Sequence, residues 1–153
     1  MANQVEVIPD YSRNMTKEFE GFRGQPYNDS RGIPTIGYGT NLNIHKNRIP
    51  VEVMEGQQSL APNYADQLFN EMYDEAWERA KGFATPEIFE GLSPIRKSIL
   101  ADMSYNLGNK LFQFQNMQKA VQAGDAEAVK REMKNSKWYK QVGRRSKHHV
   151  RSW

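Results

Sequence analysis

Residues 19–39, which read FEGFRGQPYNDSRGIPTIGYG, decide the fold of this chain. The stretch is rich in glycine and proline and lacks the helical repeat of apolar residues found on either side of it. We expect two short strands in it, one around Tyr27 and one over residues 35–38. The Asp-Ser-Arg-Gly sequence of residues 29–32 is typical of a turn between them. The stretch therefore predicts a small β-region near the N-terminus.

Helices are predicted on both sides of this β-region. A short helix is expected over residues 12–20, with Ser12 as its N-cap and Gly21 at its end. A long helix is expected over residues 63–82, where apolar residues recur at helical spacing and Gly82 follows the last of them. This long helix is placed to join a small β-rich lobe to a helical lobe.

The rest of the chain is also predicted to be helical. Ser93 and Pro94 form a cap followed by proline at the first helical position, and Gly108 is expected to end that helix. Shorter helices are expected at residues 115–123, at 125–135 and from Trp138 onward. The fold class predicted is α+β and mostly helical, in one domain over residues 1–153. Its parts are a β-rich lobe with a cleft at about 21–62, the connecting helix 63–82, and a helical lobe from 12–20 plus 83–153.

Composition excludes several classes of protein. With 153 residues, 38% of them hydrophobic and 25% charged, the chain is long enough to bury a core and is neither a low-complexity nor a fibrous sequence. It contains no cysteine, which excludes disulfides and thiolate chemistry. Neither a signal-peptide core nor a long apolar run is present. We therefore expect a soluble protein made in the cytosol, which needs another component to leave it.

Basic residues gather near the C-terminus. The net charge is only +3, but residues 133–153 contain no acidic residue and seven basic ones: Lys134, Lys137, Lys140, Arg144, Arg145, Lys147 and Arg151. Such a segment attracts anionic polymers such as nucleic acid, lipopolysaccharide or the bacterial wall. A solvated basic helix with no partner is the alternative. His148 and His149 lack the spacing and partners of a metal site, so neither a metal nor a cofactor is expected.

Two carboxylates have surroundings that suit acid–base chemistry. Glu20 is expected in the last turn of a helix and between phenyl rings, where the helix dipole and desolvation both favour its protonated form. Asp29 is expected in a polar turn that keeps it ionised. Cleavage of a glycosidic bond needs one carboxyl group in each state. Among 18 acidic residues such a pair is weak evidence by itself.

Three segments together resemble the active-site region of phage lysozymes of the T-even type, glycoside hydrolase family 24. They are residues 19–22 (FEGF), 27–29 (YND) and 34–39 (PTIGYG). That family carries Glu, eight residues, Asp, five residues and Thr, and Glu20, Asp29 and Thr35 keep both spacings. Residues 103–108, Phe114, residues 136–141 and Arg145 resemble its C-terminal lobe in order and spacing, so the resemblance covers about residues 12–150.

The resemblance implies a two-lobed lysozyme fold and a muramidase activity. Glu20 would donate a proton to the β-1,4 link between N-acetylmuramic acid and N-acetylglucosamine in peptidoglycan, while Asp29 and Thr35 would hold the attacking water, giving inversion. The substrate-binding set would be Tyr105, Asn106 and Arg145. The first two would line the cleft with an aromatic ring and an amide. Arg145 would lie against the catalytic glutamate.

The sequence also departs from the family's pattern. Thr40 and Met72 stand where the T-even enzyme has a histidine and its acidic partner, so that buried ion pair is absent. Asn41, Met117 and Glu132 replace a leucine, a serine and an asparagine that contact substrate, which leaves the sugar subsites undefined.

Alternative functions remain open at this point. A lytic transglycosylase needs the acid but no water-activating carboxylate, and a non-catalytic wall-binding module of lysozyme fold needs neither. A basic nucleic-acid binder has the C-terminal charge but no recognised motif, so no nucleic-acid partner is expected. The implied role is a monomeric phage endolysin. It would reside in the host cytoplasm before lysis, act on the wall or periplasm, and depend on a holin-type partner for export.

Overall fold

The computed structural model describes residues 6–153 and contains ten α-helices, two 3₁₀ helices and three strands within that range. In chain order they are α1 (Asp10–Glu20), β1 (Arg23–Asn28), β2 (Pro34–Gly37), β3 (Thr40–Asn41), α2 (Leu42–His45), η1 (Lys46–Arg48), α3 (Val51–Met54), α4 (Pro62–Ala84), α5 (Pro86–Gly91), α6 (Pro94–Leu107), η2 (Gly108–Gln113), α7 (Gln115–Ala123), α8 (Ala126–Lys134), α9 (Lys137–Gln141) and α10 (Arg144–Ser152). The mostly helical α+β class predicted from the sequence is confirmed.

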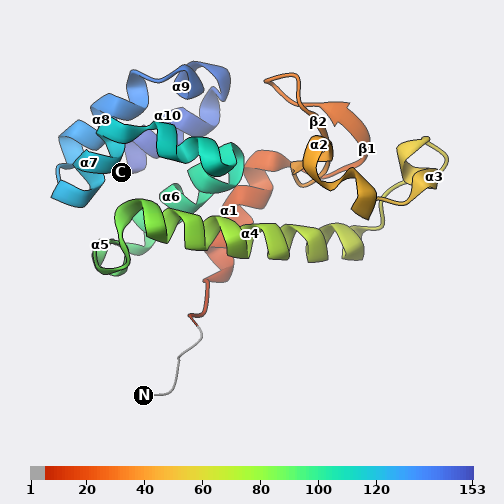
Figure 1. Ribbon diagram of the computed structural model, residues 1–153, viewed down its shortest axis with the longest axis horizontal. Helices are drawn as coiled ribbons and strands as arrows, with labels where there is room; N and C mark the ends of the chain where they lie inside the picture. The colour runs from red at the N-terminus through yellow and green to blue at the C-terminus, as the bar shows by residue number, and fades with distance from the viewer. Residues whose placement is uncertain (1–5) are drawn as a thin grey trace.

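The long helix α4 runs along one side of the molecule (Figure 1). The sheet and the short helices α2 and α3 lie at one end of α4, and helices α5–α10 gather at the other. Helix α1 crosses α4 and packs against α6, so the start of the chain belongs with the helical part.

The sheet is antiparallel with the strand order β1-β2-β3. Tyr27 is paired with Thr35, and Arg23 with Gly37, so the register shifts between these two pairs. Gly24 and Pro26 lie in this irregular part of β1, and proline has no N–H to donate to a ladder. The sequence analysis did not predict β3, which is only two residues long.

Two apolar clusters form the core. The smaller one lies under the sheet and contains Ile36, Leu42, Ile49, Val53, Leu60, Ala65 and Leu68. The larger one lies among the helices and includes Trp77, Trp138 and Trp153. Helix α4 supplies residues to both clusters: Ala65 and Leu68 to the first, Phe69 through Ala84 to the second.

Helix α4 ends later than Gly82, the residue expected to stop it. Phe83 and Ala84 continue the helix and are fully buried, which stabilises the extra turn. The helix ends before Thr85, whose φ is +77° and which precedes a proline. A residue before proline disfavours the α conformation, so Thr85–Pro86 is the physical stop.

The expected N-cap at Ser12 is wrong. Helix α1 begins at Asp10 after Pro9, and Ser12 lies inside it, fully buried, with its Oγ 2.6 Å from Oγ of Ser98 on α6. The hydroxyl therefore joins two helices instead of capping one. The cap predicted at Ser93 is confirmed, since its Oγ accepts a hydrogen bond from the Arg96 backbone N–H at 3.3 Å.

Within residues 6–153, no helix combines the length and apolar character needed to cross a membrane.

Candidate active site

A cleft of about 400 Å³ lies between the sheet and the helical part. Glu20, Asp29 and Thr35 all line it, although they come from the end of α1, the turn after β1 and strand β2. The other lining residues include Gly39, Asn41, Ile44, His45, Met72, Glu75, Arg79, Tyr105, Asn106 and Lys110. The structure thus brings the three residues of the predicted catalytic set to one cavity.

Asp29 is held by the turn that it opens. Its Oδ1 accepts hydrogen bonds from the backbone N–H groups of Arg31 at 2.8 Å and Ile33 at 2.9 Å. Gly32 has a φ of +76°, a conformation that glycine adopts without strain and that the tight turn needs. The local sequence therefore fixes the orientation of the carboxylate, and both backbone bonds use the same oxygen.

Thr35 lies beside this turn on β2 and is 3% exposed. Its hydroxyl donates a hydrogen bond to the backbone carbonyl oxygen of Ile33 at 2.6 Å. Because the proton is committed to that carbonyl, the hydroxyl oxygen faces the cleft as an acceptor. Asp29 and Thr35 thus present acceptor oxygens to the same cavity.

Glu20 is the last residue of α1, and its carboxyl group lies against the backbone of Gly39. A Cβ atom at position 39 would come within 2.5 Å of Oε1 of Glu20, and the φ of Gly39 is +73°. Both facts require glycine there. The Gly-Tyr-Gly end of the β-region therefore makes room for the carboxyl group of Glu20.

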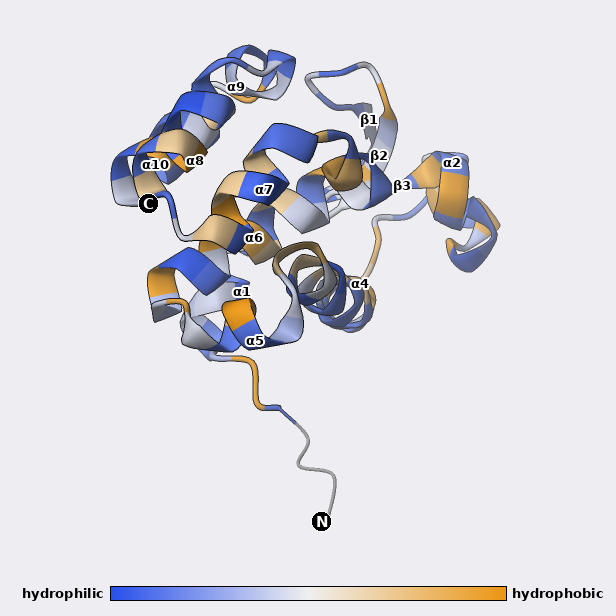
Figure 2. Cartoon of the chain, turned by 60° about the vertical axis from the view of Figure 1, so that its left-hand side comes forward, coloured by the Kyte–Doolittle hydropathy of each residue, from blue (hydrophilic) through white to orange (hydrophobic). Residues whose placement is uncertain are grey.

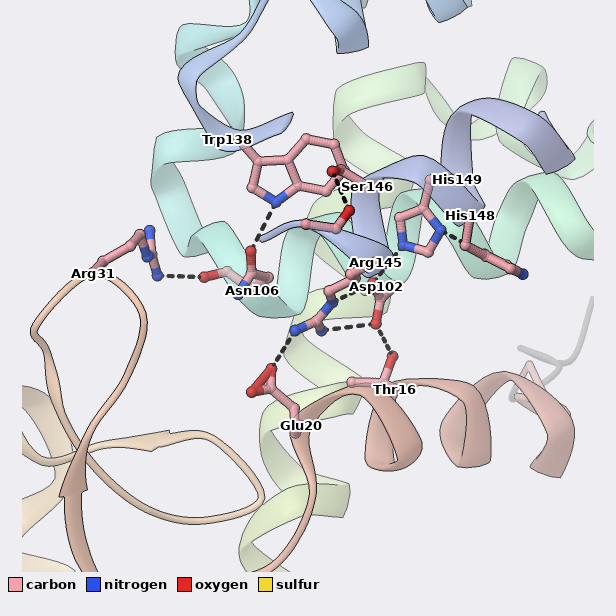
Figure 3. A network of polar contacts seen from close by, with 11 residues as sticks. Thr16, Glu20, Arg31, Asp102, Asn106, Trp138, Arg145, Ser146, His148 and His149 are labelled. Carbon is pink, nitrogen blue, oxygen red and sulfur yellow. Dashed lines mark hydrogen bonds and ion pairs between the residues drawn. The ribbon is translucent and has the colours of Figure 1, made fainter. Parts of the chain in front are cut away.

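Arg145 contacts Glu20 (Figure 3) but is not itself among the residues that line the cleft. Its Nη1 donates to Oε2 of Glu20 at 2.8 Å, and the side chain is almost fully buried. The contact with the glutamate that the resemblance implies is present. The predicted substrate-binding set assumed that Arg145 contacts the sugar directly. That contact stays a prediction, and the buried position of Arg145 does not favour it.

The sequence analysis missed Asp102, which is fully buried on α6. Its carboxylate accepts bonds from Nε of Arg145 at 2.7 Å and from Nη2 of Arg145 at 2.8 Å. Thr16 and His149 complete its partners. A signal for it exists in the sequence: an aspartate in the middle of the apolar run Ile99–Met103 is unusual unless it is paired.

Tyr105 reaches across the cleft. Its ring lines the cavity, and its hydroxyl donates a hydrogen bond to the backbone carbonyl oxygen of Tyr38, between β2 and β3. Burial raises the pKa of the Tyr105 hydroxyl, and the charge of Glu20 adds to this effect. The hydroxyl thus joins the two sides of the cleft, and a contact between the ring and a sugar stays a prediction.

Asn106 follows in the same wall of the cleft. Its Oδ1 accepts a bond from Nε1 of Trp138 at 2.8 Å, and its backbone carbonyl accepts one from Nη2 of Arg31 at 2.9 Å. The bond from Trp138 orients the amide so that its NH₂ group is left as a donor. A contact between this amide and an N-acetyl group stays a prediction.

The residues that depart from the T-even pattern contact each other as the ion pair would. The hydroxyl of Thr40 lies 3.5 Å from the sulfur of Met72. Met72 lines the cleft, as do Asn41 and Ile44, a largely exposed apolar residue on α2. Figure 2 shows hydrophobic residues on α2, at the edge of the molecule. Arg79 and Lys110 line the same cleft, and contacts between any of these side chains and a sugar stay a prediction.

In residues 6–153 no group of three or more His, Asp and Glu side chains is placed to hold a metal ion. The cleft is lined by three carboxyl groups, those of Glu20, Asp29 and Glu75, and by the hydroxyl of Thr35.

A cleft lined by a glutamate and an aspartate contains the two carboxyl groups that cleavage of a glycosidic bond uses. The family model described as phage lysozyme matches residues 17–151, and the chain belongs to that family. Among curated proteins no sequence matches the chain. Membership of the family indicates a peptidoglycan-hydrolysing enzyme of the lysozyme class.

Proposed function

We propose that the protein is a muramidase that cleaves the β-1,4 bond between N-acetylmuramic acid and N-acetylglucosamine with inversion. The observation that carries the proposal is the meeting of Glu20, Asp29 and Thr35 in one cleft at the spacing of the phage lysozyme motif. The different surroundings of the two carboxyl groups support different roles. Glu20 faces a single arginine, and Asp29 is held by backbone N–H groups.

In the proposed reaction Glu20 donates its proton to the glycosidic oxygen as the bond to the anomeric carbon breaks. A water attacks that carbon from the opposite face and gives a proton to Asp29. Oδ1 of Asp29 is occupied by backbone N–H groups, so Oδ2 is the acceptor for the water. The hydroxyl oxygen of Thr35 accepts a hydrogen bond from the second O–H of the same water, and that hydrogen stays on the new anomeric hydroxyl. No covalent intermediate forms, and exchange with solvent afterwards removes the proton from Asp29 and returns one to Glu20.

Release of reducing ends from purified peptidoglycan tests the proposal. Glu20→Gln and Asp29→Asn should each lower the rate at least about a hundredfold, since general acid–base catalysis contributes about 10²–10⁴-fold. Circular dichroism would verify that both variants fold. The anomeric form of the first product, observed by NMR, distinguishes inversion from retention.

Other outcomes of the same assay favour the alternatives. Anhydro ends in place of reducing ends would indicate a lytic transglycosylase. Binding to peptidoglycan with no cleavage would indicate a wall-binding module. The intact Asp29–Thr35 arrangement favours hydrolysis over both, because neither alternative needs a site that holds water.

We further propose that the basic C-terminal segment concentrates the enzyme on an anionic wall or on lipopolysaccharide. Six of its seven cations are exposed, Arg145 being the exception: Lys134, Lys137, Lys140, Arg144, Lys147 and Arg151. Hydrophilic residues predominate along α8–α10 in Figure 2. Lys147→Glu with Arg151→Glu should weaken sedimentation with cell walls and leave cleavage of short soluble oligomers unchanged. Equal losses in both assays would contradict the proposal.

The proposed biological role is that of a phage endolysin. A monomeric enzyme would accumulate in the host cytoplasm and reach the wall through a holin-type partner. Expression of the chain with and without a membrane-permeabilising protein tests this role. Lysis that requires the second protein supports it, and lysis by the chain alone contradicts the dependence on a holin.

A further inference from the structure

A buried carboxylate outside the cleft controls how Arg145 faces Glu20. Asp102 is 0% exposed, and its two oxygens accept four hydrogen bonds. Oδ1 accepts from Oγ1 of Thr16 at 2.6 Å and from Nη2 of Arg145 at 2.8 Å. Oδ2 accepts from Nε of Arg145 at 2.7 Å and faces Nε2 of His149 at 2.5 Å. Figure 3 shows these residues as one connected network that ends at Glu20.

The two bonds from Arg145 to Asp102 fix the plane of the guanidinium group. Nε and Nη2 lie on one edge of that planar group and contact both carboxylate oxygens, an arrangement with high directional specificity. Nη1 is thereby left pointing at Oε2 of Glu20. The position of Arg145 against the proposed acid therefore depends on Asp102.

The same contacts set the charge that Glu20 experiences. Burial alone would raise the pKa of Asp102, yet Arg145 and His149 hold it well below its usual range. Burial alone would lower the pKa of Arg145, and the charges of Asp102 and Glu20 raise it instead. Asp102 is consequently ionised at any working pH. Its negative charge offsets part of the positive charge of Arg145.

His149 completes this arrangement through its tautomer. An ionised Asp102 is an acceptor only, so Nε2 of His149 carries the proton that it donates. In the neutral ring Nδ1 of His149 is then an acceptor, which faces Nδ1 of His148 at 3.0 Å. His149 is fully buried and stacks on Trp138, which holds the ring in place.

We propose that Asp102 is a positioning residue of the reaction: it aims Arg145 at Glu20 and offsets the charge of Arg145, so that Glu20 keeps its proton for the glycosidic oxygen. The inference rests on the proposed function of Glu20 as the general acid. An arginine facing Glu20 without this counter-charge would favour the ionised carboxylate and remove the acid at lower pH.

Other charged or titratable groups also surround the network: Arg13 on α1, Arg23 and Tyr27 on β1, Asp29 in the following turn, Tyr73 on α4, Tyr105 on α6, and His148, His149 and Arg151 on α10. Burial raises the pKa of the three tyrosines, which therefore stay neutral in the range of interest. The two histidines are the remaining neighbours on α10 from which the effect of Asp102 has to be separated by a control variant.

The test is the pH dependence of kcat/KM in the Asp102→Asn variant. The alkaline limb of this pH profile, where activity falls as the general acid loses its proton, should move to lower pH by about one unit. The reason is that the variant lacks the negative charge that offsets the charge of Arg145. At the pH optimum kcat should fall about tenfold or more with KM little changed, because neither Asp102 nor Arg145 is among the cleft-lining residues. A folded variant whose limb stays in place, or moves to higher pH, would overturn the proposal.

Two matched variants separate the role of Asp102 from a general effect of removing a charge and from an effect of His149. Asp74→Asn removes the same charge from an ion pair with Arg13 in which the aspartate is exposed, and it should leave the limb unmoved. His149→Gln removes the imidazole and keeps an N–H donor for Asp102, so the limb should again stay in place. A shift in His149→Gln equal to that in Asp102→Asn would assign the effect to the histidine and overturn the proposal.

A second variant covers the case in which Asp102→Asn does not fold. Asp102→Asn with Arg145→Gln replaces the buried ion pair by two amides and leaves no uncompensated charge. Its alkaline limb should lie at higher pH than in the wild type, since the nearer charge of Arg145 is removed as well. An unmoved limb would overturn the proposal. Full activity in Glu20→Gln would instead contradict the proposed function itself, so the two failures are distinguishable.

Discussion

The hydroxyl of Tyr105 on α6 is hydrogen-bonded to the backbone carbonyl oxygen of Tyr38 at the end of β2, and this bond joins the two walls of the cleft. The ring of Tyr105 contacts Phe69 of α4 at a centroid distance of 5.2 Å. Tyr38 packs against both apolar clusters. The tyrosine pair therefore links the sheet to the helical core at the cleft.

Tyr105→Phe should lower the free energy of unfolding by about 1 kcal/mol, the usual contribution of one hydrogen bond. It should leave KM unchanged, since the ring that faces the cleft is kept. Tyr105→Ala should raise KM severalfold in addition, if the ring contacts a sugar as predicted. Urea unfolding and steady-state kinetics measure the two effects. An unchanged KM in the alanine variant would contradict the role in substrate binding.

Gly39→Ala should lower kcat at least about tenfold, because the new Cβ would lie 2.5 Å from Oε1 of Glu20 and push the acid out of place. Stability should fall by about 1 kcal/mol through strain at a positive φ. Gly56→Ala is the control, since Gly56 has a φ of +78° and open space around its Cβ position. It should lose similar stability and keep full activity; matching losses of activity in both would contradict the argument.

Thr35→Val should lower kcat about tenfold or more with little change in stability. The hydroxyl that accepts from the proposed water is lost, while the Ile33 carbonyl still accepts from the backbone N–H of Asp29 at 3.0 Å. Thr35→Ser keeps the hydroxyl and should keep most of the activity. Turnover of soluble peptidoglycan fragments at saturating substrate measures this directly. Equal activity in the two variants would show that the hydroxyl takes no part.

Acid should remove the stability that Asp102 provides. Its folded-state pKa lies below the unfolded value of about 3.9, so its contribution is present above about pH 4 and is lost as pH falls through the folded pKa. Asp102→Asn should be destabilised by several kcal/mol at pH 6, because the buried Arg145 loses Asp102 as a charged partner and keeps Glu20. The difference in the free energy of unfolding between this variant and the wild type should narrow steadily below pH 4. Denaturant unfolding at pH 6 and pH 3 tests this, and a constant gap would contradict it.

Local features of the site are largely predictable from the sequence. The turn at residues 29–32 and the cap at Ser93 both depend on residues close together in the chain. Errors arose where long-range packing overrides a local rule. Ser12 can cap a helix, yet it is buried against Ser98, and Gly82 does not end α4 because Phe83 and Ala84 pack into the core.

The buried contacts of Asp102 could not be predicted from local sequence rules. Helix α6 is buried on every side over Ser98–Ser104, so it has no polar face from which to recognise an inward-pointing charge. Its partners come from α1 and α10, which lie far away in the sequence and meet α6 only in the folded chain. The spacing of apolar residues along one helix carries no information about contacts with helices far away in the sequence.

The sequence by itself determined the spacing of Glu20, Asp29 and Thr35, the glycines that shape the turns around them and the helices that follow. Each of these depends on interactions between near neighbours in the chain. Only the tertiary structure decided that Asp102 holds Arg145 in its contact with Glu20, a residue 125 positions away in sequence. The physical reason is burial: a charge removed from water needs its partner at hydrogen-bond distance, and only the packing of α1, α6 and α10 brings the partners together.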